Sequence, residues 1–272
     1  MDVALSKNGA RLLRVFFALV VVFLYAPILI LLIFSFNNSD VPSFPLSGFT
    51  LHWYYEFLTN ADLRNALETS AVVAALSSAV AVVLGILASI ALVRRRFRAK
   101  GPVSALLLSP LVLPLVVFGI SLLLLFHAIG MQLGITTVVI GHIVISLPYT
   151  ILVIMPRLQQ IDASLEEAAY DLGASRLRTF RSITFPLTLP AVVSAFLIAF
   201  TTSFDEYAVA SFVVGQTVTF PIYLYSALRF PNQLPQVIAV AVVVITVSLA
   251  VVVAAEVGRR IAESRLGDLE PS

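Results

Sequence analysis

Two adjacent carboxylates, Asp205 and Glu206, are the most informative charged residues of this chain, because they lie within a long apolar stretch. A carboxylate at membrane depth is costly unless it is paired, solvated or facing a cavity. No Lys or Arg lies close to the pair in the sequence, so a cationic solute is a candidate partner. Tyr207, Tyr223 and Tyr225 add aromatic rings that suit a cation. The alternative is a solvated pair that only marks the outer end of a span.

The depth of this pair depends on where its helix begins. A helix starting near Pro190 places Asp205 and Glu206 about 15 residues in, or roughly 22 Å along the axis, in the outer half of a hydrocarbon core about 30 Å thick. Successive residues of a helix point in different directions, so the two cannot both face one narrow cavity. We expect one carboxylate to contact the substrate and the other to bind nearby backbone. Asp205 is favoured as the contact, because its short side chain restricts where its charge can reach.

Other chemistries lack their residues. The chain has no cysteine, and its three histidines, His52, His127 and His142, are too scattered to predict a metal site. We expect each histidine to be a satisfied core or interface residue. A phosphate-binding Gly-x4-Gly-Lys-Ser/Thr loop is missing, so the chain is not expected to bind ATP or any other cofactor. A membrane-embedded hydrolase is the alternative from another class, but neither a Gly-x-Ser-x-Gly elbow nor a paired histidine motif is present.

The composition indicates an all-α integral membrane protein. Hydrophobic residues make up 60% of the 272 residues and charged residues only 12%, far from the balance of a soluble domain. A formal net charge of +2 also argues against a nucleic-acid binder. Both an ordinary soluble enzyme and a disordered chain are therefore excluded.

Charge-free runs place the membrane spans, since a spanning helix needs roughly 20 apolar residues. They predict six spans in a single transmembrane domain covering residues 1–272, at about 13–37, 68–93, 102–128, 134–156, 189–213 and 235–258. A seventh candidate, residues 207–228, is rejected as a continuous helix because Gly215 and Pro221 interrupt it. The N-terminal run is too long for a signal peptide, so we expect an uncleaved first span.

The distribution of basic residues predicts the orientation. With six spans, 15 of the 17 Lys and Arg residues fall on one side of the membrane. Basic residues favour the cytoplasmic side of short loops, so both termini are expected in the cytoplasm of a multi-pass protein surrounded by membrane lipid. A seventh span would move the three C-terminal arginines to the other side.

The inward loop at residues 157–188 is unlike the other, shorter inward loops. Asp162 is expected to cap a helix carrying an apolar stripe, Gly173 to end it, and Ser175 to cap a second helix. Pro186 and Pro190 then mark the entry to the fifth span. A small helical hairpin outside the bilayer suggests docking to a soluble partner, and the alternative is a solvated hairpin without one.

This loop resembles the EAA signature of ABC-importer permease subunits. Glu167-Ala168-Ala169 is followed after three residues by Gly173, and after nine more by Ile183-Thr184-Phe185-Pro186, where Phe185 replaces the usual leucine. The resemblance implies that the loop couples the chain to an ATPase through the residues Glu167, Ala168, Ala169, Asp171, Gly173, Ala174 and Ser175.

A wider resemblance covers nearly the whole chain. Residues 141–149, 168–175, 203–215 and 220–226 are similar to the C-type permease subunits of spermidine/putrescine importers. This family implies a type I importer in the bacterial inner membrane, with polyamine as the cargo. The implied partners are a second permease subunit, two ATP-binding cassette ATPase subunits and a periplasmic or lipid-anchored substrate-binding protein. Related importers carry opines, amino acids or phosphonates, and these remain alternatives, although Asp205 and Glu206 argue against anions.

Overall fold

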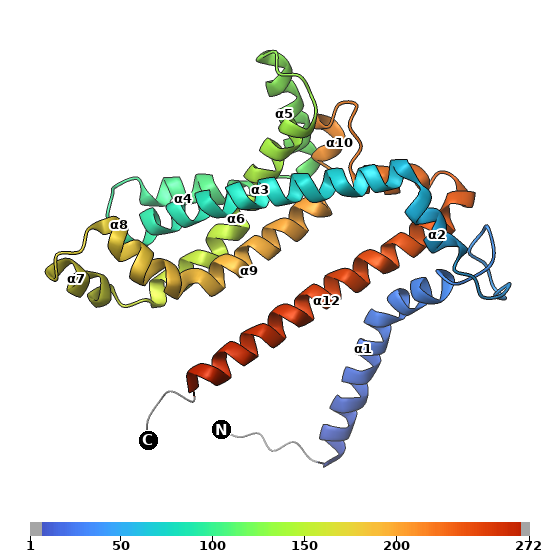
Figure 1. Ribbon diagram of the computed structural model, residues 1–272, viewed down its shortest axis with the longest axis horizontal. Helices are drawn as coiled ribbons and strands as arrows, with labels where there is room; N and C mark the ends of the chain where they lie inside the picture. The colour runs from blue at the N-terminus through green and yellow to red at the C-terminus, as the bar shows by residue number, and fades with distance from the viewer. Residues whose placement is uncertain (1–6, 268–272) are drawn as a thin grey trace. The chain divides into compact units, whose positions relative to one another are not determined.

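A computed structural model describes residues 7–267 of the chain, and within that range the only extended pairing is an isolated bridge between Asn37 and Phe49. The rest is helical or irregular (Figure 1). The α-helices are α1 (Lys7–Phe34), α2 (His52–Thr59), α3 (Ala61–Arg94), α4 (Lys100–Leu108), α5 (Leu115–Ala128), α6 (Ile135–Gln160), α7 (Ala163–Asp171), α8 (Arg176–Thr179), α9 (Phe185–Phe204), α10 (Ala210–Val213), α11 (Phe220–Ala227) and α12 (Leu234–Gly267). Short 3₁₀ turns lie at Ser109–Leu111 and Pro231–Gln233, and a π turn at Phe180–Thr184.

The helices form two compact units, residues 1–61 with 226–272, and residues 62–225. In the first unit α12 packs on α1 and α2. The segment joining α1 to α2 is held by side chains: the Trp53 indole donates to the Asn37 carbonyl at 2.8 Å, and the Tyr54 hydroxyl donates to Ser35 Oγ at 2.7 Å. Most of the described α1 side chains are apolar, and the rest of the chain leaves them exposed, as expected of a helix that faces lipid or another subunit.

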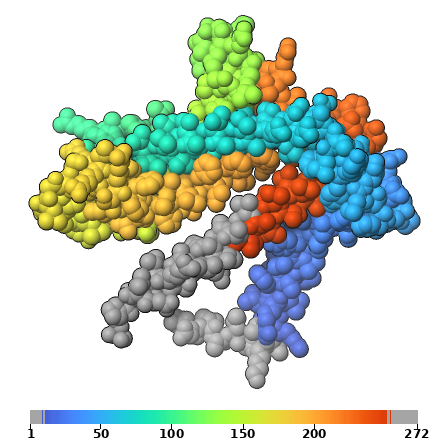
Figure 2. Space-filling view, in the orientation of Figure 1, coloured from blue at the N-terminus to red at the C-terminus, as the bar shows by residue number. Residues whose placement is uncertain are grey.

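The second unit is built on α3, α6 and α9, and Figure 2 shows the segment from α7 to α8 at one end of it. The α6 and α9 helices pack along their length. A Cβ atom at Gly85 of α3 would collide with the Thr150 hydroxyl of α6, and that hydroxyl donates to the Ala81 carbonyl at 3.1 Å. Glycine is therefore required for α3 and α6 to approach this closely.

Within residues 7–267, five helices are long and apolar enough to span a membrane, and a bent pair counted as one span makes a sixth. The five are Arg11–Phe34, Ala61–Arg94, Ile135–Gln160, Arg176–Phe204 and Pro231–Ala250. The bent pair joins Lys100–Leu111 to Leu115–Ala128 at 104°, so the segment 102–128, predicted as one span, is not one straight helix. Pro110 and Pro114 flank the break, and proline cannot donate the backbone bonds that would continue the helix.

The fifth predicted span, 189–213, also needs correction. The helical run starts at Arg176, passes through the π turn and ends at Phe204, so Asp205 and Glu206 follow the helix and do not lie within it. Pro186 crowds the carbonyl four residues earlier, and the wider π turn just before it accommodates that crowding without a break. The rejection of residues 207–228 as one helix is confirmed: α10 and α11 are short, and Gly215 turns the chain between them with φ +65°.

Candidate functional site

A cavity of about 440 Å³ opens in the second unit where α9 ends. One wall is the break between α4 and α5, and another is α6 with Ile145 and Tyr149. The floor is the segment from Asp205 to Ala208, and Tyr225 of α11 completes it. Non-helical backbone at membrane depth is tolerated only where it is buried in protein or lines a cavity. The break between α4 and α5 and the end of α9 both lie at this cavity, which makes it the candidate site.

Asp205 lines the cavity as the C-terminal cap of α9. Its side chain is exposed, and its carboxylate has no hydrogen-bond or ion-pair partner among the described residues. A negative charge facing a partly enclosed space is stabilised by water or by a cation that enters. Asp205 is thus the acidic group of the cavity that is available to a ligand.

The carboxylate of Glu206, in contrast to that of Asp205, is bound by the protein's own backbone. Its side chain is buried, and its two carboxylate oxygens accept hydrogen bonds from the backbone N–H groups of Val209, at 2.8 and 3.0 Å, and Ala210, at 2.9 Å. One member of the carboxylate pair was expected to bind backbone, and Glu206 does so. The expected reason, opposed directions on one helix, was wrong, because the helix has already ended. The bonds fix the chain as it turns from α9 into α10.

A buried polar network extends from Glu206 to three helices. The Nδ1 atom of His142 in α6 lies 2.7 Å from the Ser203 hydroxyl of α9, within hydrogen-bond distance. Its Nε2 atom lies 3.3 Å from Glu206 Oε2, but the two groups are not aligned for a hydrogen bond. That hydroxyl lies 2.9 Å from Ser77 Oγ of α3. His142 is a core residue as expected, but only its Nδ1 has a hydrogen-bond partner, so the expectation that it is fully satisfied was wrong. The network ties the cavity floor to α3, α6 and α9.

Two tyrosines cover one side of the cavity. The rings of Tyr207 and Tyr225 stack with their centroids 4.1 Å apart and an interplanar angle of 25°. Tyr223 does not line the cavity, because residues two apart on a helix point to nearly opposite sides. Tyr149, which sequence reasoning did not select as a site residue, does line it. The wall formed by the α4–α5 break was not predicted either, and the two prolines around that break were the sequence signal for it.

The loop between α6 and α9 has the local structure that its sequence predicts. Asp162 caps α7, its Oδ1 accepting the Ser164 backbone N–H at 2.9 Å. Hydrogen bonds from the Ser164 backbone and side chain lower the pKa of Asp162, so this cap is charged at neutral pH. Gly173 follows α7 with φ +81°, and Ser175 caps α8. Each local signal is confirmed.

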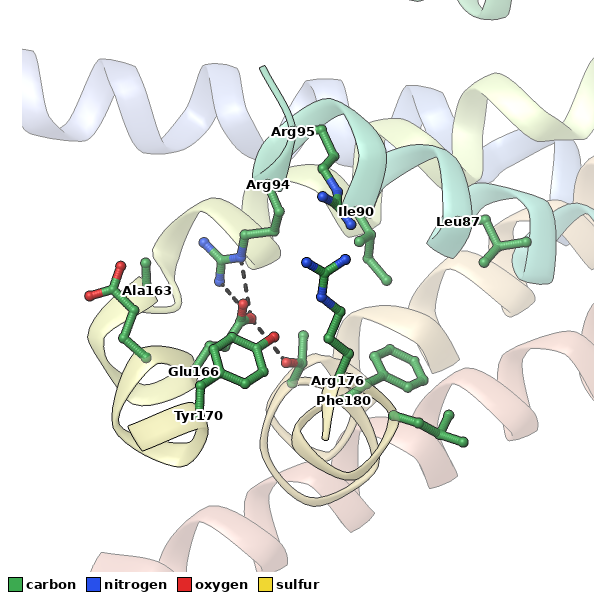
Figure 3. A pocket seen from close by; sticks show the side chains of 12 residues that line it. Leu87, Ile90, Arg94, Arg95, Ala163, Glu166, Tyr170, Arg176 and Phe180 are labelled. Atoms are coloured by element: carbon green, nitrogen blue, oxygen red, sulfur yellow. Dashed lines mark hydrogen bonds and ion pairs between the residues drawn. The ribbon is translucent and has the colours of Figure 1, made fainter. Parts of the chain in front are cut away.

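A single glutamate anchors this loop to α3, and it is Glu166, just before the EAA signature. Its Oε1 lies 3.1 Å from Arg94 Nη2 (Figure 3) and accepts from the Thr184 hydroxyl at 3.0 Å. Arg94 also donates to the Ile161 carbonyl at 3.1 Å. Glu167 has no such partner among the described residues and is exposed.

Of the residues assigned to ATPase coupling, Glu167, Ala168, Asp171, Gly173 and Ser175 are exposed on this loop, and Ala169 and Ala174 are partly so. Leu172 beside them is 89% exposed. Leu165 and Leu177 are exposed as well, so the segment from α7 to α8 presents several apolar side chains at its surface. No three His, Asp or Glu side chains gather to hold a metal ion in the part of the chain that the structure describes.

Comparisons with known proteins identify the family of this chain. Residues 81–261 match the family described as "Binding-protein-dependent transport system inner membrane component". The putrescine transport system permease protein PotI of Escherichia coli K12 is 39% identical over 231 residues, which is 82% of each chain. The spermidine/putrescine transport system permease protein PotC of the same strain is 36% identical over 263 residues, 96% of this chain and 99% of PotC.

A solved structure shares the fold. It is a bacterial ABC transporter involved in the import of the acidic polysaccharide alginate, with a TM-score of 0.71 and 16% identity, covering 94% of this chain and 98% of the other. This similarity concerns the fold, whereas the family match and the two bacterial relatives concern the sequence over most of its length. The chain belongs to the binding-protein-dependent transport system inner membrane components.

Proposed function

We propose that this chain is the permease subunit of an ABC importer for a polyamine such as putrescine or spermidine. The observation that carries the proposal is Asp205, a carboxylate without a protein partner in a cavity walled by stacked tyrosines. An alkyl diamine presents ammonium groups joined by methylene carbons. The carboxylate attracts the charge, and the ring faces accept both the cation and the methylene chain. The named cargoes of PotI and PotC agree with that chemistry.

Within the proposal, Asp205, Tyr207 and Tyr225 contact the substrate, and Tyr149 joins them. Glu206 and His142 hold the floor of the cavity in place. The fold alone does not select a cationic cargo, because the alginate importer shares it. The residues of the cavity therefore carry the assignment of the substrate class.

The remaining parts of the importer are other subunits. The chain would pair with a second permease subunit and receive substrate from a periplasmic or lipid-anchored binding protein. A related alginate importer has been solved in complex with its periplasmic protein. ATP hydrolysis would take place on two ATPase subunits that bind the loop from α7 to α8. That assignment places the loop and both termini in the cytoplasm.

Uptake measured against a panel of solutes tests the proposal. Cells without other polyamine uptake would express the chain with its partner permease, ATPase and binding protein. We expect saturable, ATP-dependent uptake of labelled putrescine or spermidine, with little inhibition by a phosphonate, an opine or a neutral amino acid. Preferred uptake of any of those three competitors would contradict the assignment.

A further inference from the structure

A second cavity, of about 640 Å³, lies where α3 ends beside the loop from α7 to α8. Leu87, Ile90 and Arg95 line it from the α3 side, and Tyr170, Arg176 and Phe180 from the loop side (Figure 3). The size falls in the range of about 300–1,000 Å³ that is usual for small-molecule sites. All of these residues belong to the second unit.

The charges in this cavity are not balanced locally. Arg94 is satisfied by Glu166 and the Ile161 carbonyl. Arg95 and Arg176 have no hydrogen-bond or ion-pair partner among the described residues, yet their guanidinium groups point toward one another (Figure 3). Both side chains are exposed, so water and salt screen their mutual repulsion, and an anion between them would be attracted by both. Glu167 also lines the cavity, so one carboxylate stands against two unpaired guanidinium groups.

The other wall is apolar and extends away from the charges. Leu87 lies seven residues before Arg94, which corresponds to about 10 Å along the axis of α3. Leu177 and Phe180 face the same cavity from α8 and the π turn. A soluble anion, or a carboxylate from another protein, would use only the arginine end. A molecule with an anionic head and a hydrocarbon body would use the whole cavity.

We propose that this cavity binds a membrane phospholipid, with the headgroup phosphate between Arg95 and Arg176. Arginine suits phosphate because its planar guanidinium can donate two parallel hydrogen bonds. The first carbons of an acyl chain would lie along Leu87, Ile90 and Phe180. Basic pockets beside a spanning helix at a membrane surface are where headgroups are bound. This inference goes beyond transport and requires only that α3 ends at a membrane surface.

A bound headgroup would connect α3 to α8 next to the Arg94–Glu166 ion pair. The loop from α7 to α8 would then be held by two links, one made by protein and one by lipid. The lipid would therefore act as a structural component of the surface assigned to ATPase docking.

Native mass spectrometry of the full-length chain in mild detergent tests this site. After delipidation, phosphatidylglycerol is added back and the lipid-bound fraction is measured for Arg95→Gln/Arg176→Gln and for the matched control Arg96→Gln/Arg178→Gln. The control removes two neighbouring arginines that do not line the cavity. We expect binding to weaken roughly a hundredfold when Arg95 and Arg176 are both replaced, and to change within about twofold for the control. Equal binding by the two double variants would overturn the proposal.

Two further arms separate the possible occupants. Leu87→Gln should weaken phosphatidylglycerol binding while leaving Arg95 and Arg176 in place, and glycerol 3-phosphate at millimolar concentration should not displace the lipid. Displacement by that soluble phosphate would identify a free anion site instead. If Arg95→Gln/Arg176→Gln binds lipid normally but loses ATPase association, the cavity receives a partner carboxylate and the lipid proposal is wrong.

Discussion

Asp205 and Glu206 are neighbours in the sequence but have different environments in the structure. Asp205 faces the cavity without a protein partner, while Glu206 is buried and satisfied by backbone N–H groups. A buried carboxylate that accepts several hydrogen bonds stabilises the fold, and an unpaired one in a cavity is available to a ligand. Substitution of each residue should therefore affect a different property.

Glu206→Gln should destabilise the protein. The side-chain amide can still accept a hydrogen bond, but its NH₂ group would face the Val209 and Ala210 N–H donors. We expect a loss of about 1–3 kcal/mol, measured as a lower thermal unfolding midpoint of the purified chain. Asp205→Asn is the matched control and should unfold like the parent. Equal midpoints for all three proteins would show that the backbone bonds of Glu206 do not matter.

At the scale of elements, the loop from α7 to α8 offers another matched pair. Glu166 is anchored to Arg94 and Thr184, whereas the adjacent Glu167 is exposed. Glu166→Gln should remove about 1.5–3 kcal/mol of local stability, because charge-assisted bonds are lost. Amide hydrogen exchange in residues 163–171 should then become at least about tenfold faster. Glu167→Gln should leave that exchange unchanged, and if it speeds exchange equally, Glu166 is not the anchor.

The backbone conformation at Gly173, in the same loop, can be tested by substitution. A Cβ atom there would meet nothing within 4 Å, so the only penalty for Gly173→Ala is its φ of +81°, which costs an L-residue about 1 kcal/mol. We expect ATP turnover to become less tightly coupled to uptake while the amount of protein in the membrane stays the same. Gly101→Ala is the control, because that site has equal space and no positive φ. Identical coupling in the two variants would contradict the role of this turn.

The elements also show what the sequence could predict. The caps of the loop depend on residues a few positions apart, so Asp162, Gly173 and Ser175 could be placed correctly. The break between α4 and α5 was not predicted, because the hydrophobicity of an apolar run is the same whether its helix is straight or bent. Pro110 and Pro114 were the only local sign of it.

Contacts between distant segments could not be predicted in the same way. Arg94 and Glu166 lie 72 residues apart, and His142 and Ser203 lie 61 apart. Nothing in a single sequence pairs them, since each pair depends on how helices pack. The carboxylate pair that the sequence singled out lies at the cavity, while its position after α9, with Glu206 turned to the backbone, required the structure.

At the scale of the whole molecule, the orientation predicted from the basic residues can be tested with cysteines. The chain has none, so labelling has no background. A thiol reagent that does not cross membranes should label Asn60→Cys only from outside and Arg178→Cys only from the cytoplasm. A membrane-permeant reagent should label both. Labelling of Asn60→Cys from the cytoplasm would contradict the six-span topology and with it the docking side of the loop.

Transport by the assembled importer carrying Asp205→Asn is the most direct test of the central claim, that a carboxylate in the cavity recognises a cationic substrate. The substitution keeps the size of the side chain and removes its charge. We expect kcat/KM for putrescine or spermidine uptake to fall about tenfold to a hundredfold, as for the loss of one charge-assisted contact of about 1.5–3 kcal/mol. Thermal stability and ATPase association should not change. Parent-level polyamine uptake by Asp205→Asn would contradict the account, because no other unpaired carboxylate lines the described cavity.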